Sequence, residues 1–554
     1  MSELPGIGVG RGIAYGHVLR MADPLGEPAT GSLDGSAEDA KAAVHEALAA
    51  VAADLTRRGA LAGGDAQAVL EAQALMAQDP TLIDDVHARI DGGTNAERAV
   101  YDAFAAFQQI LVSMGGYMGE RAADLGDVAQ RIIAKLRGEP APGVPQSETP
   151  FVLVARDLAP ADTALLDLDR VLALITQDGG PTSHTAILAR AKGITAIVGV
   201  SGADSLVDGD AVVVDAVAGT VTVAPSPELV TATEKRITDR LAALDAPLTA
   251  GALADGTGVP LLANLGSPAD GAGAVALGAE GVGLFRTEFL FLDAPTAPSV
   301  ASQKASYVEL LAAFPGKKVV VRALDAGADK PLPFLTDQGE ENPALGRRGL
   351  RALRYHEEIL RDQLTALAQA DAETEADLWV MAPMVADAEE TEYFVSLARE
   401  LGIRTAGVMA EVPSLALMAE QVLVSADFVS IGTNDLTQYT LAADRLLGSV
   451  ASYQDPWHPA VLRLVAQLGA AGKDAGKAVG ICGEAAADPL LAVVLVGLGA
   501  TTLSMTPAAL ADVRAELAKH TLDEAQAMAR AALAASTAAT AAAAAAAAVQ
   551  DPVA

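Results

Sequence analysis

The chain has 554 residues, of which 51% are apolar and only 4% aromatic, and its formal net charge is −33. Such an acidic surface repels phosphate backbones, so the charge excludes a nucleic-acid-binding role. No apolar run reaches the roughly 20 residues of a membrane-spanning helix, and the N-terminus lacks a signal region, so we expect a cytoplasmic protein without direct membrane insertion. The single cysteine, Cys482, excludes an internal disulfide.

The first part of the chain contains a helical insert. A glycine-rich start with a strand-like run at 13–19 is followed by apolar residues at helical spacing. This spacing predicts helices at 36–57, 65–78, 80–91, 95–114 and 115–137, separated by Gly-Gly or Asp-Pro breaks. A proline-rich linker at 138–149 ends the insert. We therefore expect a helical domain over 22–138.

The segment 179–193, GGPTSHTAILARAKG, places His184 where a loop becomes a helix. The free N–H groups of a first helical turn favour an anion such as a phosphoryl group. A lone histidine at such a place is usually only a cap. None of the other six histidines has a comparable glycine-rich, hydroxyl-flanked setting, which favours a functional role for His184.

Strand-like runs surround this histidine and form a compact α/β unit. Together with residues 1–21, the segment 146–226 predicts one α/β domain. A helical connector should follow over 227–250, beginning at a Ser-Pro-Glu sequence.

From about residue 251 to 530 the chain alternates strands and helices eight times, which is typical of a (β/α)₈ barrel of the TIM type. The predicted strands are 259–266, 281–285, 318–325, 378–385, 404–413, 427–435, 477–485 and 501–507. The remaining residues, 531–554, are an alanine-rich tail that we expect to fray or be disordered.

Polar residues gather where these strands end, and active sites of such barrels lie at that face. They are Asn264, Arg286, Arg322, Glu411, Asn434, Asp435, Cys482, Glu484 and Ser504. Arg286, Arg322 and Arg445 would bind a multiply charged small substrate, with Lys330 and Arg348 as further candidates. Glu411 and Asp435 are hard oxygen ligands suited to Mg²⁺. Cys482 is either an inert buried thiol or a proton donor to a metal-bound enolate.

Long motifs make the sequence similar to enzyme I of the phosphoenolpyruvate-dependent sugar phosphotransferase system. They are GGPTSHTAILAR, GAEGVGLFRTEFLF, RALDAGADK, EENPALGRRGLR, GVMAEVPS, SIGTNDLTQYTLAADR and GICGEAA. The resemblance extends from the N-terminus to about residue 510. It implies a swivelling phosphohistidine α/β domain with a helical-bundle insert, followed by a phosphoenolpyruvate-binding barrel.

The resemblance also implies roles. Phosphoenolpyruvate would phosphorylate His184, which would pass the group to a histidine of a small carrier, HPr, docked on the helical insert. The implied substrate ligands are Arg286, Arg322, Asn434, Asp435 and Arg445; Glu411 and Asp435 hold Mg²⁺, and Cys482 protonates the enolpyruvate carbon. It further implies a homodimer formed through the barrel, and hinges near 138–149 and 226–245.

Two alternatives remain open at this stage. Pyruvate phosphate dikinase and phosphoenolpyruvate synthase share the histidine unit and the barrel but need an ATP-binding domain, for which the first 150 or so residues offer no phosphate-binding glycine-rich loop. A silent regulatory module that senses phosphoenolpyruvate would tolerate loss of His184, Cys482 or an arginine, and all of these are present.

Overall fold

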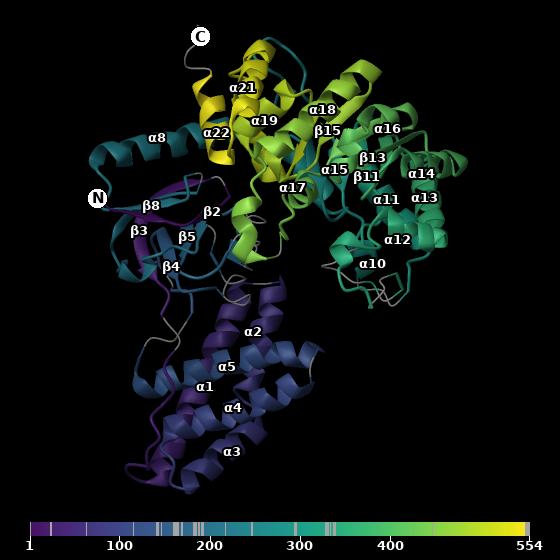
Figure 1. The fold of residues 1–554 in the computed structure, drawn as a ribbon. Coiled ribbons are helices and arrows are strands. Elements are labelled where there is room, and N and C mark those ends of the chain that lie inside the picture. Colours follow the sequence, from purple (N-terminus) through teal and green to yellow (C-terminus); the bar gives the residue numbers. More distant parts are fainter. Residues whose placement is uncertain are drawn as a thin grey trace. The chain divides into compact units, whose positions relative to one another are not determined.

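The computed structural model describes residues 2–548 apart from the positions named at the end of this paragraph. The chain divides into two compact units, Met1–Ile237 and Thr238–Ala554 (Figure 1). Two predicted site residues, His184 and Lys330, lie outside the described residues. The positions left out are 11, 23–24, 63, 115, 140–142, 146, 159–165, 168–169, 181–184, 187–188, 190–192, 217, 245–247, 293–295, 327–331, 333, 336–338 and 446.

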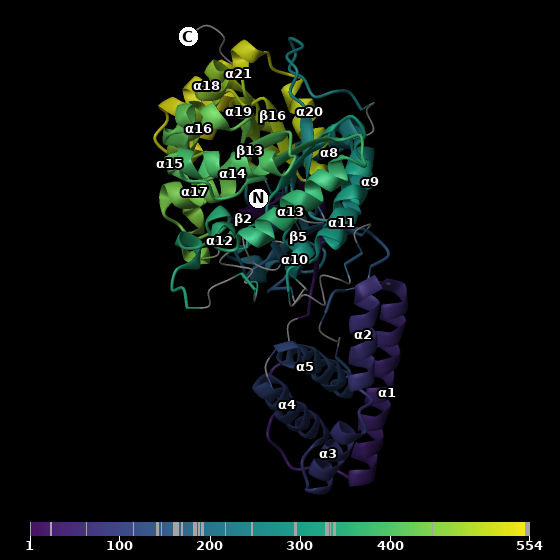
Figure 2. The ribbon, with the colours of Figure 1, turned by 90° about the vertical axis from the view of Figure 1, so that its right-hand side faces the viewer.

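Five helices form a bundle in the first unit, close to the predicted boundaries. Figure 2 shows the first two lying side by side, and their buried faces share one apolar core that includes Leu55, Phe104 and Ile132. Local capping sets some boundaries: the Asp79 carboxylate accepts the N–H of Thr81 at 2.8 Å, which satisfies a free donor of the first turn. The helices are α1 (Ala37–Ala62), α2 (Gly64–Met76), α3 (Pro80–Asp91), α4 (Ala96–Met114) and α5 (Gly116–Arg137).

An eight-stranded mixed sheet makes up the rest of the first unit, in the order β1-β8-β7-β3-β4-β5-β6-β2. Alternate residues of a strand point to opposite faces. Accordingly Phe151 and Leu153 join one apolar core and Val152 and Val154 the other, so both faces of the sheet are covered. The elements are β1 (Ser2–Pro5), β2 (Ile7–Val9), β3 (Ile13–Arg20), β4 (Phe151–Ala155), β5 (Val171–Thr176), β6 (Ala196–Val198), β7 (Ala211–Asp215), β8 (Thr220–Val223) and, after the sheet, α8 (Pro227–Leu244).

The two strands at the edges of this sheet, β1 and β2, were not expected from the sequence. They pair antiparallel with β8 and β6, respectively. Glycine and proline in this segment argue against a central strand, but an edge strand tolerates them because one side needs no hydrogen bonds.

The second unit is a closed barrel of eight parallel strands, as the sequence predicted. Each strand has one inward and one outward face. On the third strand Val319 and Val321 pack outward against the helices, whereas Val320 belongs to an interior cluster with Met409 and Phe428. The strands are β9 (Leu261–Leu265), β10 (Val282–Phe285), β11 (Lys318–Arg322), β12 (Asp377–Ala382), β13 (Thr405–Ala410), β14 (Phe428–Ile431), β15 (Ala478–Ile481) and β16 (Thr502–Met505).

Helices surround the barrel, and α11 and α13 lie side by side on its outside (Figure 2). Short 3₁₀ turns at Pro343–Leu345, Gly448–Tyr453, Glu484–Ala487 and Pro507–Ala509 join some of the elements. The helices are α9 (Asp270–Ala276), α10 (Phe289–Leu292), α11 (Val300–Ala312), α12 (Leu350–Tyr355), α13 (Glu357–Asp371), α14 (Ala388–Glu400), α15 (Pro413–Leu417), α16 (Ala419–Ser425), α17 (Thr433–Leu441), α18 (Pro459–Ala475), α19 (Pro489–Gly497), α20 (Leu510–Leu517), α21 (Leu522–Ala534) and α22 (Ala538–Ala547).

The expectation of a frayed alanine tail was wrong for its first part. Residues Ala538–Ala547 form α22, which packs against α19 and α21. Ala541 and Ala545 are fully buried, and the Thr537 hydroxyl caps the helix by accepting the N–H of Thr540 at 3.2 Å. Alanine has the highest helix propensity, and the small side chains allow close contact with the neighbouring helices. Residues 549–554 lie outside the described part.

Among the helices that the structure describes, none combines the length and the apolar character that a bilayer crossing requires.

Candidate active site

The strand alternation carries charged side chains into the barrel mouth. Arg322 is the last residue of β11 and follows Val320, an interior residue, by two positions. Glu411 comes directly after β13 and follows the interior Met409 by the same spacing. Because parallel strands of a barrel all end at one face, both side chains reach the same mouth.

A chain of buried ion pairs crosses this mouth. Arg348 binds two carboxylates at once, Asp435 at 2.8 and 3.1 Å and Asp325 at 3.1 and 3.2 Å. Arg322 lies 3.1 Å from Asp325, and Arg445 lies 3.3 Å from Asp435. The carboxylates and guanidinium groups therefore alternate, which compensates charges that have been removed from water.

The pKa values in this chain of ion pairs reflect burial and charge together. Burial lowers the pKa of Arg348, but Asp325 and Asp435 outweigh it, so the pKa lies above its ordinary value. Burial raises the pKa of Asp325, but Arg322 and Arg348 outweigh it, and the pKa lies below its ordinary value. Both groups are thus held in their charged forms.

Arg322 also forms a short ion pair with Glu288, which follows β10. Among the described residues, the Arg322 Nε and the second carboxylate oxygen of Glu288 are buried without a hydrogen-bond partner. A buried polar atom without a partner is costly, and an oxygen of a bound anion would satisfy the guanidinium Nε.

Glu411 lies almost fully buried beside these groups. One of its oxygens accepts the N–H of Met384 at 2.7 Å. Gly432 makes room for it, because a Cβ at that position would lie 2.8 Å from the other oxygen. Burial, followed by the charges of Asp435 and Asp325, raises the pKa of Glu411 to about 8. At Glu411 burial and the two neighbouring carboxylates thus outweigh the opposing charges of Arg322 and Arg348.

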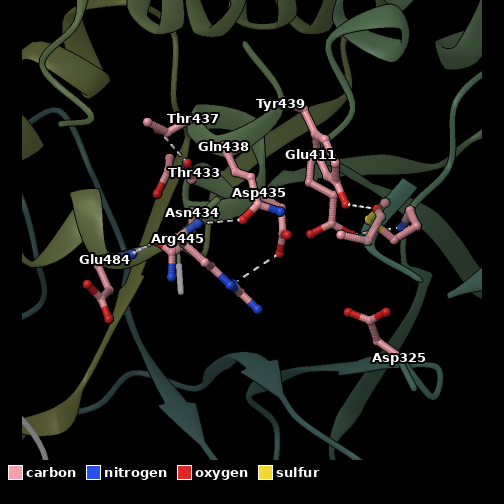
Figure 3. Close-up of polar contacts among 12 residues, drawn as sticks. Asp325, Glu411, Thr433, Asn434, Asp435, Thr437, Gln438, Tyr439, Arg445 and Glu484 are labelled. Carbon is pink, nitrogen blue, oxygen red and sulfur yellow. Dashed lines mark hydrogen bonds and ion pairs between the residues drawn. The ribbon is translucent and has the colours of Figure 1, made fainter. Parts of the chain in front are cut away.

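Asn434 and Asp435 lie in the first turn of α17. The sequence had predicted them at the end of β14. Figure 3 shows their side chains with Arg445 and Glu484. The Asn434 side-chain oxygen accepts the N–H of Glu484 at 3.1 Å, which ties α17 to the turn after β15. The strand is shorter than predicted because Gly432 begins the helix.

Cys482 follows β15 and is 2% exposed, in the interior cluster with Met409 and Phe428. Burial raises the pKa of its thiol to about 11, so the group is protonated at neutral pH. The thiol lies 3.5 Å from the carbonyl oxygen of Ile431. A protonated thiol in a buried mouth is able to donate a proton to carbon.

The structure brings together most of the predicted site residues. Arg322, Arg348, Glu411, Asp435 and Arg445 share direct contacts or charge interactions, and Arg286 at the end of β10 is close enough to influence the pKa of Cys482. His184 and Lys330 lie outside the described residues. Sequence reasoning missed Glu288 and Asp325, although each follows a chosen arginine by two or three residues within the same strand–loop segment.

The described residues contain no cluster of three or more histidine, cysteine or acidic side chains with metal-binding geometry. Glu411 and Asp435 nevertheless fit Mg²⁺, which needs only one or two protein carboxylates when substrate oxygens complete its octahedron. The raised pKa of Glu411, caused by burial and by the charge of Asp435, marks a place where a divalent cation would relieve repulsion.

Comparison with known families matches most of the chain. Three models match in succession: the N-terminal model of PEP-utilising enzymes at residues 5–121, the mobile-domain model at residues 147–219 and the PEP-binding-domain model at residues 244–522. The barrel and its charged mouth therefore define the PEP-binding domain of a PEP-utilising enzyme.

Curated relatives narrow this class. Proteins named phosphoenolpyruvate-protein phosphotransferase are 55% identical over 96% of both chains in Streptomyces coelicolor and 41% identical over 90% of this chain and 89% of the relative in Haloferax volcanii. The Bacillus subtilis protein of that name is 36% identical over 95% of this chain and 96% of its own. The chain belongs to the phosphoenolpyruvate-protein phosphotransferase family, the enzyme I family, which confirms the predicted family and the predicted transferase class.

Proposed function

We propose that this chain transfers the phosphoryl group of phosphoenolpyruvate to its own His184 and then to a histidine of an HPr-type carrier protein. Pyruvate is the second product, and the reaction is the first step of sugar uptake by the phosphotransferase system. The observation that carries this proposal is the barrel mouth, where buried arginines and carboxylates lie beside a protonated thiol. These are the groups that binding and cleaving an enol phosphate requires.

Substrate binding falls to the guanidinium groups. Arg286, Arg322 and Arg445 bind the phosphate and carboxylate of phosphoenolpyruvate, and the unpartnered Nε of Arg322 is a donor ready for one of these oxygens. Asn434 supplies a further polar contact, and Lys330 is a further candidate ligand. We assign Arg348 to holding Asp435 rather than to the substrate, because its contacts with Asp325 and Asp435 already engage all three of its nitrogens.

Glu411 and Asp435 are the proposed magnesium ligands, in line with the general magnesium dependence of PEP-utilising enzymes. When bound, the ion would neutralise charge on the phosphoryl and enolate oxygens. Asp435 also accepts hydrogen bonds from Arg348, which orient its carboxylate toward the mouth.

The chemistry is an in-line displacement followed by a protonation. The Nε2 of His184 forms a bond to phosphorus as the bond from phosphorus to the enol oxygen breaks. The enolate carbon then takes the proton of the Cys482 thiol, giving pyruvate, and the thiolate regains a proton from solvent. The raised pKa of the thiol keeps that proton available at neutral pH.

The proposal extends to partners and setting. His184 has to meet the barrel and the carrier in turn, so the segments 138–149 and 226–245 act as hinges of a swivelling domain. The carrier docks on the helical bundle, and a homodimer forms through the barrel. A chain with a single cysteine suits a reducing compartment, so we assign the reaction to the cytoplasm.

The test is phosphorylation of the full-length protein by phosphoenolpyruvate labelled in its phosphoryl group, with Mg²⁺ and without ATP. We expect an acid-labile phosphoprotein that does not form when Mg²⁺ is chelated. His184→Gln should abolish the label, whereas His45→Gln, at an exposed position of α1, should retain it. Label that survives His184→Gln would refute the proposed acceptor. Labelling by ATP in the absence of phosphoenolpyruvate would instead favour the dikinase alternative.

A further inference from the structure

Asn264 contacts the turn that carries Cys482, although 218 residues separate the two positions. Its side-chain nitrogen donates to the backbone carbonyl of Cys482 at 3.0 Å and to that of Ser504 at 3.4 Å. The Ser504 hydroxyl, which is buried, donates to the side-chain oxygen of Asn264 at 2.5 Å. Strands β9 and β16, which neighbour each other in the barrel, thus hold the backbone of the residue that follows β15.

The orientation of the Asn264 amide follows from these partners. Two carbonyl oxygens face its nitrogen, and a rotated amide would place oxygen against both of them. The Ser504 hydroxyl then donates to the remaining oxygen. Space for Ser504 depends on Gly283 of β10, because a Cβ at that position would lie 2.4 Å from the Cβ of Ser504.

The opposite side of the Cys482 turn is held as well. The Cys482 N–H donates to the carbonyl of Ile431 at 3.0 Å. Gly483 packs so closely on α17 that an added Cβ would lie 1.9 Å from the Thr433 hydroxyl. Asn264 therefore supplies the contact that fixes the carbonyl side of Cys482, whereas the N–H side is fixed by β14.

We propose that Asn264, oriented by Ser504, is a positioning residue that holds the Cys482 thiol toward the enolate carbon. Asn264 acts through the backbone of Cys482 and is not a catalytic residue. The inference rests on the proposed function, since it assumes that Cys482 is the proton donor. Without this contact the turn would relax, and the enolate would be protonated by solvent instead of by the thiol.

The stereochemistry of protonation is a readout that a merely structural role would not change. The substrate is the 3-methyl derivative of phosphoenolpyruvate in deuterated water, which gives 2-oxobutyrate with a chiral deuterated carbon. The wild-type protein should form one enantiomer, because the thiol reaches one face of the enolate. Asn264→Ala should yield a mixture approaching equal amounts while still forming the phosphoprotein.

A second readout does not need the reaction. Cys482 is the only thiol of the chain, so a thiol reagent reports on it alone. We expect Asn264→Ala to speed modification at least about tenfold, because the thiol is no longer held in the buried cluster. This measurement tests the role of Asn264 separately from the proposed function. A wild-type protein that is not phosphorylated refutes the proposed function, whereas the rates of thiol modification still test whether Asn264 holds Cys482.

The controls use the same chemistry elsewhere. Asn95 also donates its amide to two backbone carbonyls, those of Ala29 and Gly31, and Asn95→Ala should leave the stereochemistry unchanged.

In a Cys482→Ala background, Asn264→Ala should have no further effect on the stereochemistry of protonation. If Asn264→Ala fails to fold, Ser504→Ala, which removes only the hydroxyl, replaces it in the test. This variant should show a partial loss of enantiomeric excess. Retention of a single enantiomer in the variants, or an equal further loss in the Cys482→Ala background, overturns the proposal.

Discussion

Arg322 and Lys318 stand at opposite ends of β11, and the two cations differ in how their charge is compensated. Arg322, at the carboxyl end, contacts Glu288 and Asp325. The Lys318 ammonium lies 3.5 Å from the ring centroid of Trp379, with Asp377 as the acidic neighbour. Burial lowers the pKa of Lys318 to about 8, and Asp377 offsets this only in part. The amino-terminal end of the barrel thus carries a charge that costs stability.

Lys318→Met should therefore stabilise the barrel at pH 7 by about 1–2 kcal/mol. In the wild-type protein the unfolded chain binds more protons than the folded chain between pH 8 and 10.5, so stability rises with pH in that window. The advantage of the variant should accordingly be full below pH 8 and vanish above pH 10.5. Urea unfolding followed by tryptophan fluorescence measures it.

The matched control is Lys317→Met, at the exposed neighbouring lysine, which should change the unfolding free energy by less than about 0.5 kcal/mol. An unchanged or lowered stability of Lys318→Met at pH 7 would show that the contact with Trp379 outweighs the burial of the ammonium group.

At the scale of elements, α22 shows how an alanine run becomes part of a core. Ala541 and Ala545 occupy one face at a spacing of four residues and pack on α19 and α21. The hydrophobic pattern of the sequence cannot mark this face, since every position of α22 except Thr540 carries alanine. What selects the buried face is the shape of the neighbouring helices.

Ala541→Glu should lower the free energy of unfolding of the barrel unit by about 1–3 kcal/mol, because the carboxylate either enters the core or detaches the helix. Ala543→Glu, at an exposed position two residues further on, introduces the same helix propensity and the same charge. It should leave the free energy of unfolding nearly unchanged. Denaturant unfolding of both variants measures the difference. Equal effects would mean that α22 contributes through helix formation alone, without docking.

At the scale of the whole molecule, the cores are separate. The helical bundle, the two faces of the mixed sheet and the barrel each have their own apolar cluster. The two tryptophans of the chain, Trp379 and Trp457, belong to the second unit, so their fluorescence reports on the barrel only. Far-ultraviolet circular dichroism reports on both units.

We therefore expect the thermal transitions seen by fluorescence and by circular dichroism not to coincide. The proposed function implies that the His184→Gln variant cannot turn over. In this variant, phosphoenolpyruvate with Mg²⁺ should raise the midpoint of the fluorescence transition, because ligand binding stabilises the unit that binds it. The part of the circular dichroism transition that belongs to the first unit should not move. A single coincident transition that shifts as a whole would instead indicate that the two units unfold together.

Much of this protein followed from the sequence by itself. Apolar runs of strand length with helical intervals predict the parallel barrel, and the positions of Arg322 and Glu411 at the ends of two strands predict that they line its mouth. Strand direction then predicts that Cys482 lies at the same end. These inferences hold because each depends on local pattern and on the one rule that parallel strands share a carboxyl end.

Only the tertiary structure decided which partners these residues take. Arg348 bridges Asp325 and Asp435, which stand 110 positions apart in the numbering, and Asn264 holds the carbonyl of Cys482 across the closure of the barrel. Neither contact has a local signature, since each joins segments that lie far apart in the sequence. The burial of α22 belongs to the same class. Local patterns determine the face and end of a side chain, whereas its partner depends on how distant segments close around it.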